Sequence, residues 1–262
     1  MIRKSRTPPL GQHFLHDQGA LARIASALAI GAGDLVIEIG PGEGALTGHL
    51  LKLGARVTAL EIDPQLAAAL PERLGGPEGL EVIETDILAA DLEKVIADRS
   101  AGRVAVVGNL PYYITSPILR AAFAAAPRIR EAVFLMQKEV ALRVTAGKGS
   151  PDYGYLSVLC ELHSEAELLF SVPPGAFRPP PKVTSAVVRL SMRRNIHAPG
   201  NLLSFLQAAF RQPRKTLLNN LSRLYPRHEV ARLSESGCRA QEMSLSELKD
   251  LWQRLQPKPG TP

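Results

Sequence analysis

The chain has 262 residues, of which 45% are hydrophobic and 21% are charged, a composition typical of a globular protein with a sizeable core. No apolar run approaches the roughly 20 residues needed to cross a bilayer, and the two cysteines, Cys160 and Cys238, have no metal-binding spacing. This argues against a membrane protein, a disulfide-rich secreted domain and a metal centre, so we expect a soluble, cytoplasmic protein.

The net charge of +6 comes from one end of the chain. Residues 1–190 contain 19 Lys and Arg against 20 Asp and Glu, whereas residues 191–262 contain 12 against 5. A basic segment after a near-neutral one indicates a polyanionic partner such as nucleic acid. A solvated helical surface has a similar composition, so charge alone leaves both interpretations open.

Short apolar runs alternate with helical patterns in the first part of the chain. Runs rich in β-branched residues predict strands over 35–39, 56–60, 80–83 and 103–107. Apolar residues at helical spacing predict helices over 20–28, 45–53, 64–74 and 92–97. This alternation is typical of a doubly wound α/β domain built on a parallel sheet, a Rossmann-like fold.

The pattern changes towards the C-terminus. Helices are expected over 117–125 and 138–145 with a strand over 132–136 between them, and a loop follows at 147–152. Two further strands are expected at 166–170 and 185–190, with a proline-rich bend between them. Beyond them only helical patterns occur, over 202–210, 215–224, 229–233 and 245–255. We therefore expect an α/β domain over 1–192 and a small, basic, all-helical domain over 193–262.

Glycines follow the first strand of the predicted sheet, in the stretch Glu38-Ile39-Gly40-Pro41-Gly42-Glu43-Gly44. Glycine lets the backbone turn sharply and approach a ligand without a clash at Cβ. The spacing is G-x-G-x-G, not the G-x-G-x-x-G of dinucleotide-binding proteins, and no phosphate-binding lysine follows. A ligand-binding turn and an ordinary tight turn both fit this stretch.

Carboxylates follow the next two strands, as Glu61-Ile62 and Asp86-Ile87. In a doubly wound sheet, ligands bind outside the carboxyl ends of the strands. There, Glu61 can accept hydrogen bonds from two ribose hydroxyls, and Asp86 can accept one from an adenine amino group that Ile87 covers. An aspartate at this position is also a common helix cap. With the glycines, the order of these residues predicts a nucleoside site of the kind shared by NAD and S-adenosylmethionine enzymes.

The fourth strand ends in Asn109-Leu110-Pro111-Tyr112. Asn109 offers a side-chain carbonyl acceptor and Leu110 a backbone one, Pro111 fixes φ, and the Tyr112 ring offers a flat face to a base. An adenine N6 is a poor nucleophile because its lone pair is delocalised into the ring. Acceptors that hold its N–H bonds out of conjugation would direct that lone pair at an electrophilic methyl group. The stretch therefore predicts methyl transfer to an exocyclic amine.

Together these motifs resemble those of the S-adenosylmethionine-dependent adenine-N6 methyltransferases, and more narrowly those of the small-subunit rRNA adenine dimethyltransferases. The resemblance spans roughly residues 10 to 255. It extends to the segments at 11–15, 137–143, 172–174, 177–183, 210–211 and 214–217.

The resemblance implies a class I methyltransferase fold, S-adenosylmethionine as cofactor, and roles for three groups of residues. The cofactor pocket would be lined by Gln12, His13, Leu15, Gly40, Gly42, Glu61, Ile62, Asp86, Ile87 and Asn109. The target amine would be held by Asn109, Leu110, Pro111 and Tyr112, with Phe177 packed on the flipped adenine. Contacts to RNA would come from Arg178, Lys182, Arg211, Arg214, Lys215 and Arg223.

The resemblance also implies a substrate. Enzymes of this family dimethylate two adjacent adenosines in a loop near the 3′ end of small-subunit rRNA. The partner would be the immature 30S particle, and we expect a monomer without an obligate protein partner.

The chain departs from the family pattern at three positions. His13 and Tyr113 stand where the family often has Asn, and Pro213 interrupts its usual Arg-Arg-Lys stretch. We expect a changed polar contact at His13 and no special role for Tyr113. Phe177 has an alternative role as a core anchor.

Several other functions remain as alternatives. They are a large-subunit rRNA methyltransferase of the antibiotic-resistance type, a DNA adenine methyltransferase, an NAD oxidoreductase, and a ribosome-assembly factor for which catalysis is secondary.

Overall fold

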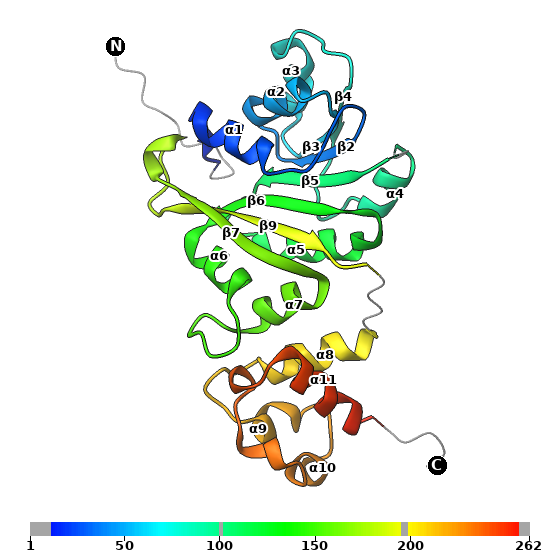
Figure 1. Cartoon of the computed structure of the whole chain (residues 1–262), viewed down its shortest axis with the longest axis vertical. Helices are drawn as coiled ribbons and strands as arrows, with labels where there is room; N and C mark the ends of the chain where they lie inside the picture. The colour runs from blue at the N-terminus through cyan, green and yellow to red at the C-terminus, as the bar shows by residue number, and fades with distance from the viewer. Residues whose placement is uncertain (1–11, 100–101, 195–198, 257–262) are drawn as a thin grey trace. The chain divides into compact units, whose positions relative to one another are not determined.

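The computed structural model describes residues 12–99, 102–194 and 199–256 (Figure 1), so Gly11 of the N-terminal motif lies outside the described residues. The chain forms two compact units. One contains the residues up to Ala141 together with Glu165–Arg194, and the other contains Leu142–Ser164 together with the C-terminal residues. The expected division at residue 192 assigns Leu142–Ser164 to the first domain, so it differs from the observed units in this segment.

A seven-stranded sheet forms the centre of the first unit, in the order β4-β3-β2-β5-β6-β9-β7. The strands are β2 (Leu35–Ile39), β3 (Arg56–Glu61), β4 (Leu80–Glu84), β5 (Val104–Asn109), β6 (Glu131–Gln137), β7 (Ser164–Val172) and β9 (Ser185–Met192). Neighbouring strands from β4 to β6 pair in parallel, whereas β9 pairs antiparallel with β6. The expected parallel sheet is therefore confirmed for β2 to β5, and β9 adds an antiparallel strand beside β6. Parallel pairing needs a crossover connection, but β9 enters the sheet from the proline-rich loop.

The α/β class is confirmed by the helices that alternate with the strands along the chain. They are α1 (Gln18–Ser26), α2 (Ala45–Lys52), α3 (Pro64–Arg73), α4 (Leu92–Ala97), α5 (Thr115–Ala124) and α6 (Lys138–Thr145), with a 3₁₀ turn, η1 (Ala126–Arg128). Three of these helices begin at an aspartate whose carboxylate accepts backbone N–H bonds, namely Asp17, Asp63 and Asp91. The inner strands are apolar on both faces because helices cover the sheet, and Val36, Ile37 and Val106 have no exposed surface.

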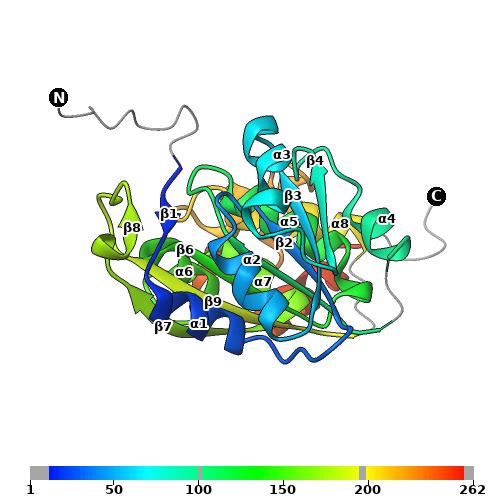
Figure 2. The same ribbon diagram turned by 90° about the horizontal axis from the view of Figure 1, so that it is seen from above.

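A two-residue ladder joins the N-terminal segment to the proline-rich loop. β1 (Phe14–Leu15) pairs antiparallel with β8 (Phe177–Arg178), which follows a 3₁₀ turn, η2 (Pro174–Ala176), and Figure 2 shows the two strands side by side. The ladder continues in a bond from the His16 N–H to the Ala176 carbonyl oxygen at 2.9 Å. Two-residue strands are too short to produce a periodicity, so these two strands were not predictable from the sequence.

The second unit is helical around its own apolar core. Its helices are α7 (Tyr155–His163), α8 (Gly200–Ala209), α9 (Leu217–Leu221), α10 (Arg227–Ala231) and α11 (Leu245–Arg254), with two 3₁₀ turns, η3 (Ser234–Gly237) and η4 (Ala240–Glu242). Phe205, Leu206, Leu217, Leu221 and Leu248 lie in this core without exposed surface. Helix α7 was not predicted. Helix α9 is shorter than expected at both ends, and at its start the preceding residues form a hydrogen-bonded loop instead. Across the described residues, none of the helices is both long and apolar enough to span a membrane.

Candidate active site

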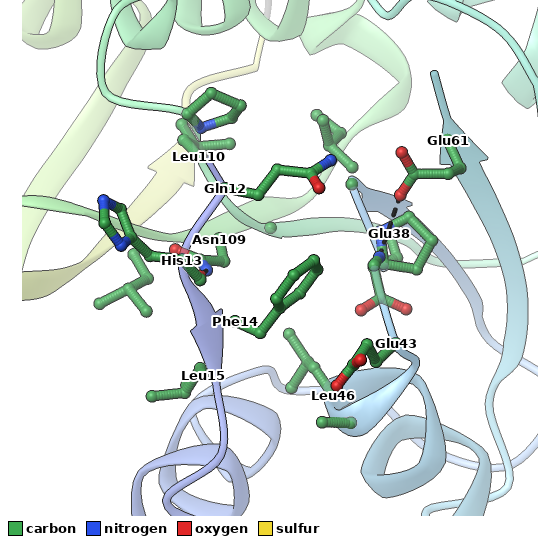
Figure 3. A pocket seen from close by; sticks show the side chains of 18 of the residues that line it. Gln12, His13, Phe14, Leu15, Glu38, Glu43, Leu46, Glu61, Asn109 and Leu110 are labelled. Atoms are coloured by element: carbon green, nitrogen blue, oxygen red, sulfur yellow. Dashed lines mark hydrogen bonds between the residues drawn. The ribbon is translucent and has the colours of Figure 1, made fainter. Parts of the chain in front are cut away.

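A cavity of about 890 Å³ lies in the first unit, at the carboxyl ends of β2, β3 and β5 (Figure 3). The residues after β4 and the segment around β1 complete its wall. All the residues predicted to bind the cofactor or the target amine line it, except Phe177. They are Gln12, His13, Leu15, Gly40, Gly42, Glu61, Ile62, Asp86, Ile87, Asn109, Leu110, Pro111 and Tyr112. The structure thus gathers side chains that are far apart in the sequence.

The glycine-rich turn after β2 places two glycines in different surroundings. Gly40 and Gly42 have φ values of 65° and 56°, which residues other than glycine rarely adopt. A Cβ on Gly42 would lie 2.8 Å from Cε1 of Phe14, whereas nothing lies within 4 Å of a Cβ on Gly40. Gly42 therefore permits close packing of Phe14. Gly40 presents bare backbone to open space in the cavity, where a ligand can approach closely.

Two carboxylates at the next strand ends are oriented by backbone N–H groups. Glu61 Oε1 accepts from the Asp63 N–H and Oε2 from the Gly42 N–H, both at 3.0 Å. Asp86 Oδ1 accepts from the Leu88 N–H at 2.9 Å within a turn, and it is not a helix cap, since the next helix, α4, is capped by Asp91. A carboxylate oxygen has two acceptor sites, so both groups keep acceptor capacity towards the cavity that they line.

A third carboxyl group in the cavity wall, Glu38, was not among the predicted site residues. It is 2% exposed, and the Thr47 hydroxyl donates to its Oε2 at 2.7 Å. Burial raises the pKa of Glu38 to about 7, and the nearby charge of Glu61 adds to this, whereas the Thr47 hydrogen bond opposes it. An acidic residue inside an otherwise apolar strand was the signal in the sequence.

Phe14 is a second residue that the site predictions omitted, although it belongs to the N-terminal motif. It lines the cavity, and Figure 3 shows its ring between β1 and the strand that carries Glu38. Its contact with Gly42 sets the distance between the N-terminal segment and the glycine-rich turn.

Asn109 and Leu110 present two consecutive hydrogen-bond acceptors. The Asn109 side-chain N–H donates to the His13 carbonyl oxygen at 2.8 Å, and the Leu110 N–H donates to the Leu135 carbonyl oxygen at 2.9 Å. Within the described part of the chain, neither Asn109 Oδ1 nor the Leu110 carbonyl oxygen accepts a hydrogen bond. The cavity wall thus holds two unused acceptors on a loop that Pro111 stiffens.

Two contacts fix the side chain of Tyr112, one at its hydroxyl and one at its ring. Its hydroxyl shares a 2.7 Å hydrogen bond with the Ser185 hydroxyl, and its ring stacks on His13 with centroids 5.9 Å apart at 27°. Burial raises the pKa of Tyr112, and the hydrogen bond with Ser185 partly opposes this rise. His13 Nδ1 in turn donates to the Pro179 carbonyl oxygen at 2.7 Å. These contacts join the N-terminal segment, the Asn109 loop and the proline-rich loop around one side of the cavity.

Phe177 lies in the core and not in the cavity wall. It is 3% exposed, belongs to the apolar core of the first unit, and does not line the cavity. It pairs with Leu15 across the β1–β8 ladder. This packing favours the core-anchor alternative, and the predicted stacking on a flipped adenine stays a prediction that the packing does not support.

The predicted RNA-binding cations are all exposed. Arg178 lines the cavity and Lys182 does not, and both belong to the first unit. Arg211, Arg214, Lys215 and Arg223 belong to the second unit. Their contacts with RNA stay a prediction.

Comparison with known proteins gives related sequences and folds. The model of the family "Ribosomal RNA adenine dimethylase" matches residues 3–252. A "Ribosomal RNA small subunit methyltransferase A" from Acidobacterium capsulatum is 42% identical over 265 residues, which cover 97% of this chain and 93% of that protein. The protein of the same name from Pseudomonas fluorescens is 38% identical and covers 95% of this chain and 93% of its own length.

Two solved structures have folds similar to that of this chain. A dimethyladenosine transferase from Plasmodium falciparum superposes with a TM-score of 0.77 at 26% identity, over 91% of this chain and 96% of that one. The 23S rRNA methyltransferase ErmE has a TM-score of 0.67 at 33% identity, over 92% of this chain and 99% of that one.

Proposed function

Because the chain belongs to the ribosomal RNA adenine dimethylase family, we propose that it transfers methyl groups from S-adenosylmethionine to N6 of adenines in small-subunit rRNA. The products would be N6,N6-dimethyladenosines at two adjacent positions in a loop near the 3′ end. The protein would act as a monomer on the immature 30S particle in the cytoplasm. The observation that supports this best is the pair of unused acceptors, Asn109 Oδ1 and the Leu110 carbonyl oxygen, in the cavity wall.

The cavity fits the cofactor in its donor and acceptor groups. Glu61 and Asp86 keep acceptor capacity for ribose hydroxyls and an adenine amino group, and the open space at Gly40 admits a ligand close to the backbone. Gln12, His13, Leu15, Gly42, Ile62 and Ile87 would complete this half of the site. S-adenosylmethionine supplies the electrophilic methyl group when bound.

The acceptor pair explains how the chain makes an amine reactive. An adenine amino group has two N–H bonds, and two acceptors side by side can take both of them. This turns the nitrogen lone pair out of conjugation and towards the cofactor side of the cavity. No strong base is required, since the proton leaves easily once the nitrogen is quaternised, and the rate gain comes from positioning and electrostatics.

The Tyr112 ring would stack on the planar ring system of the same adenine. One face of its ring stacks on His13, which leaves the other face to an adenine. Loop bases are already partly unstacked, so moving one into a cavity costs less than it does in a duplex.

The experiment that tests the function is methyl transfer from labelled cofactor to purified ribosomal particles, followed by mapping of the modified positions. We expect label at adjacent adenosines of the small-subunit rRNA. Label confined to large-subunit rRNA would instead support the type of enzyme represented by ErmE, and label in DNA or in no nucleic acid would overturn the proposal.

Asn109→Ala tests the role of the acceptor pair. We expect kcat to fall on the order of 100- to 1,000-fold, as for loss of other preorganised polar groups, while the cofactor Kd rises by less than about tenfold. Isothermal titration with the cofactor and single-turnover methylation measure the two effects. Asn201→Ala is the control, since this exposed amide donates to Gln256 in the second unit and does not line the cavity. A near-normal kcat for Asn109→Ala would contradict the role of the acceptor pair.

A further inference from the structure

Tyr113 differs from its neighbour Tyr112, although both line the cavity. Its side chain is 69% exposed, the largest value for any large hydrophobic side chain in the described part of the chain. Tyr112 is stacked on His13 and hydrogen-bonded to Ser185, whereas no ring or hydrogen-bond partner of Tyr113 occurs among the described residues. An aromatic ring kept in water at the edge of a binding cavity has large apolar faces for a ligand to cover.

The backbone that carries Tyr113 is fixed. Pro111 restricts φ before it, and the Pro111 carbonyl oxygen accepts from the Ile114 N–H and from the Thr115 hydroxyl, both at 3.2 Å. Helix α5 begins at Thr115, directly after this turn. A ring on such a support loses little conformational entropy when something stacks on it, so it can contribute to affinity.

The same cavity wall also contains a free cation. Arg178 is exposed and lines the cavity, and it has no carboxylate partner within the described residues. An exposed aromatic ring and an unpaired guanidinium beside one cavity complement the two parts of a nucleotide, a flat base and a phosphate. Because the cavity wall already provides for one adenine at Asn109, Leu110 and Tyr112, the ring of Tyr113 suits a second base.

We propose that Tyr113 is a stacking platform for a base that flanks the target adenine, with Arg178 contacting the RNA backbone. This inference rests on the proposed function, because it concerns the RNA that the cavity methylates. When the target base enters the cavity, it leaves a gap in the stack of its neighbours. The Tyr113 ring stacks on the neighbouring base in place of the target base, so the KM of the enzyme depends on the base next to the target adenosine.

The test uses an RNA hairpin substrate in three forms: unmodified, and with an abasic site on the 5′ or on the 3′ side of the target adenosine. Steady-state methylation is measured for the wild type, for Tyr113→Leu, which removes the aromatic faces, and for Tyr113→Phe, which keeps them. On the unmodified RNA we expect Tyr113→Leu to raise KM by about 5- to 100-fold, the range for loss of one base–aromatic stack. We expect Tyr113→Phe to stay within about twofold of the wild type.

The abasic substrates separate stacking from a general structural effect. One of the two abasic sites should raise KM for the wild type and for Tyr113→Phe by a factor similar to that of the Leu substitution. The same abasic site should have little further effect on Tyr113→Leu. Equal sensitivity of all three proteins to both abasic sites, or an unchanged KM for Tyr113→Leu, would overturn the inference. A wild type that fails to methylate the unmodified hairpin and ribosomal particles alike would instead contradict the proposed function.

Discussion

Glu38 is a carboxyl group enclosed by the cavity wall and the apolar residues of β2, with one hydroxyl donor, that of Thr47, and a second carboxylate, Glu61, nearby. Burial disfavours the ionised form, which is why the pKa of Glu38 rises to about 7. In the unfolded chain the same group would ionise near its ordinary value of 4.5. Between these two pH values the native state binds more protons than the unfolded state, so the contribution of Glu38 to stability falls as pH rises.

Glu38→Gln should remove this pH dependence. The glutamine keeps an acceptor for the Thr47 hydroxyl but does not ionise. We expect the free energy of unfolding of the wild type, relative to the variant, to fall by about 2 to 3 kcal/mol between pH 5 and pH 8. Urea unfolding of both proteins at several pH values measures it.

Glu72→Gln is the matched control, because this glutamate is exposed on α3. Its substitution should change the free energy of unfolding much less than Glu38→Gln does. If the free energies of unfolding of the wild type and Glu38→Gln differ by the same amount from pH 5 to pH 8, burial does not hold the Glu38 carboxyl group neutral.

At the scale of elements, the basic loop between α8 and α9 shows how a polar contact can fix a segment without regular structure. The loop contains Arg211, Arg214 and Lys215. The buried Asn220 amide points back at it and donates to the carbonyl oxygens of Ala209 at 2.8 Å and Gln212 at 3.1 Å. An amide NH₂ group has two protons, so both donors are used in holding the loop.

Asn220→Ala should therefore destabilise the second unit by roughly 1 to 3 kcal/mol, since the buried Ala209 carbonyl oxygen and the part-buried Gln212 carbonyl oxygen lose their donor. Thermal or urea unfolding measures the loss, and hydrogen exchange should show faster exchange in the loop. Asn219→Ala removes an exposed amide that donates to the Thr216 hydroxyl at 3.2 Å, and it should change stability far less. Equal effects of the two substitutions would mean that Asn220 does not hold the loop.

The elements also show what could be predicted from the sequence. Four strands were predictable from their β-branched runs, namely β2, β3, β4 and β5. The residues at or just after their carboxyl ends, Gly40, Glu61, Asp86 and Asn109 in that order, made the shared edge of the sheet predictable as the functional site. The β1–β8 ladder and helix α7 were missed. The ladder has two residues on each strand, and its partners are chosen by tertiary packing and not by local pattern.

The same limit applies to single side chains. Phe177 was assigned to the site because of the resemblance to the rRNA adenine dimethyltransferases, but strand pairing with Leu15 turns it into the core. Conversely, Tyr113 was set aside as structural, yet it is exposed at the cavity. Whether a residue next to a motif faces the core or the cavity depends on the packing of segments far apart in the sequence, which local pattern does not contain.

At the scale of the whole molecule, charge is distributed unevenly, with 12 Lys and Arg against 5 Asp and Glu after residue 190 and an overall pI of about 9.5. Cations that contact phosphates release counterions from RNA, so the binding constant should fall steeply as salt rises. We expect the triple variant Arg211→Ala, Arg214→Ala and Lys215→Ala to reduce the slope of log K against log[salt] by about 2, at roughly 0.7 for each single-stranded phosphate contact.

Fluorescence anisotropy with a labelled hairpin from 50 to 300 mM salt measures the slope. Arg128→Ala is the control, because the Arg128 guanidinium already lies 3.4 Å from a Glu93 carboxylate oxygen. An unchanged slope for the triple variant would place the phosphate contacts elsewhere on the protein.

The hydrogen bond from His13 to Pro179 joins residues 166 positions apart in the chain, and the β1–β8 ladder lies beside it. Contacts of such long range form only after the intervening chain has become compact, because closing a long loop has an entropic cost that few early contacts offset. During synthesis, the strands that carry Gly40, Glu61, Asp86 and Asn109 leave the ribosome well before Pro179 does. The cavity wall is therefore completed late, and a nascent chain that ends before β8 would have the sheet edge without a closed binding site.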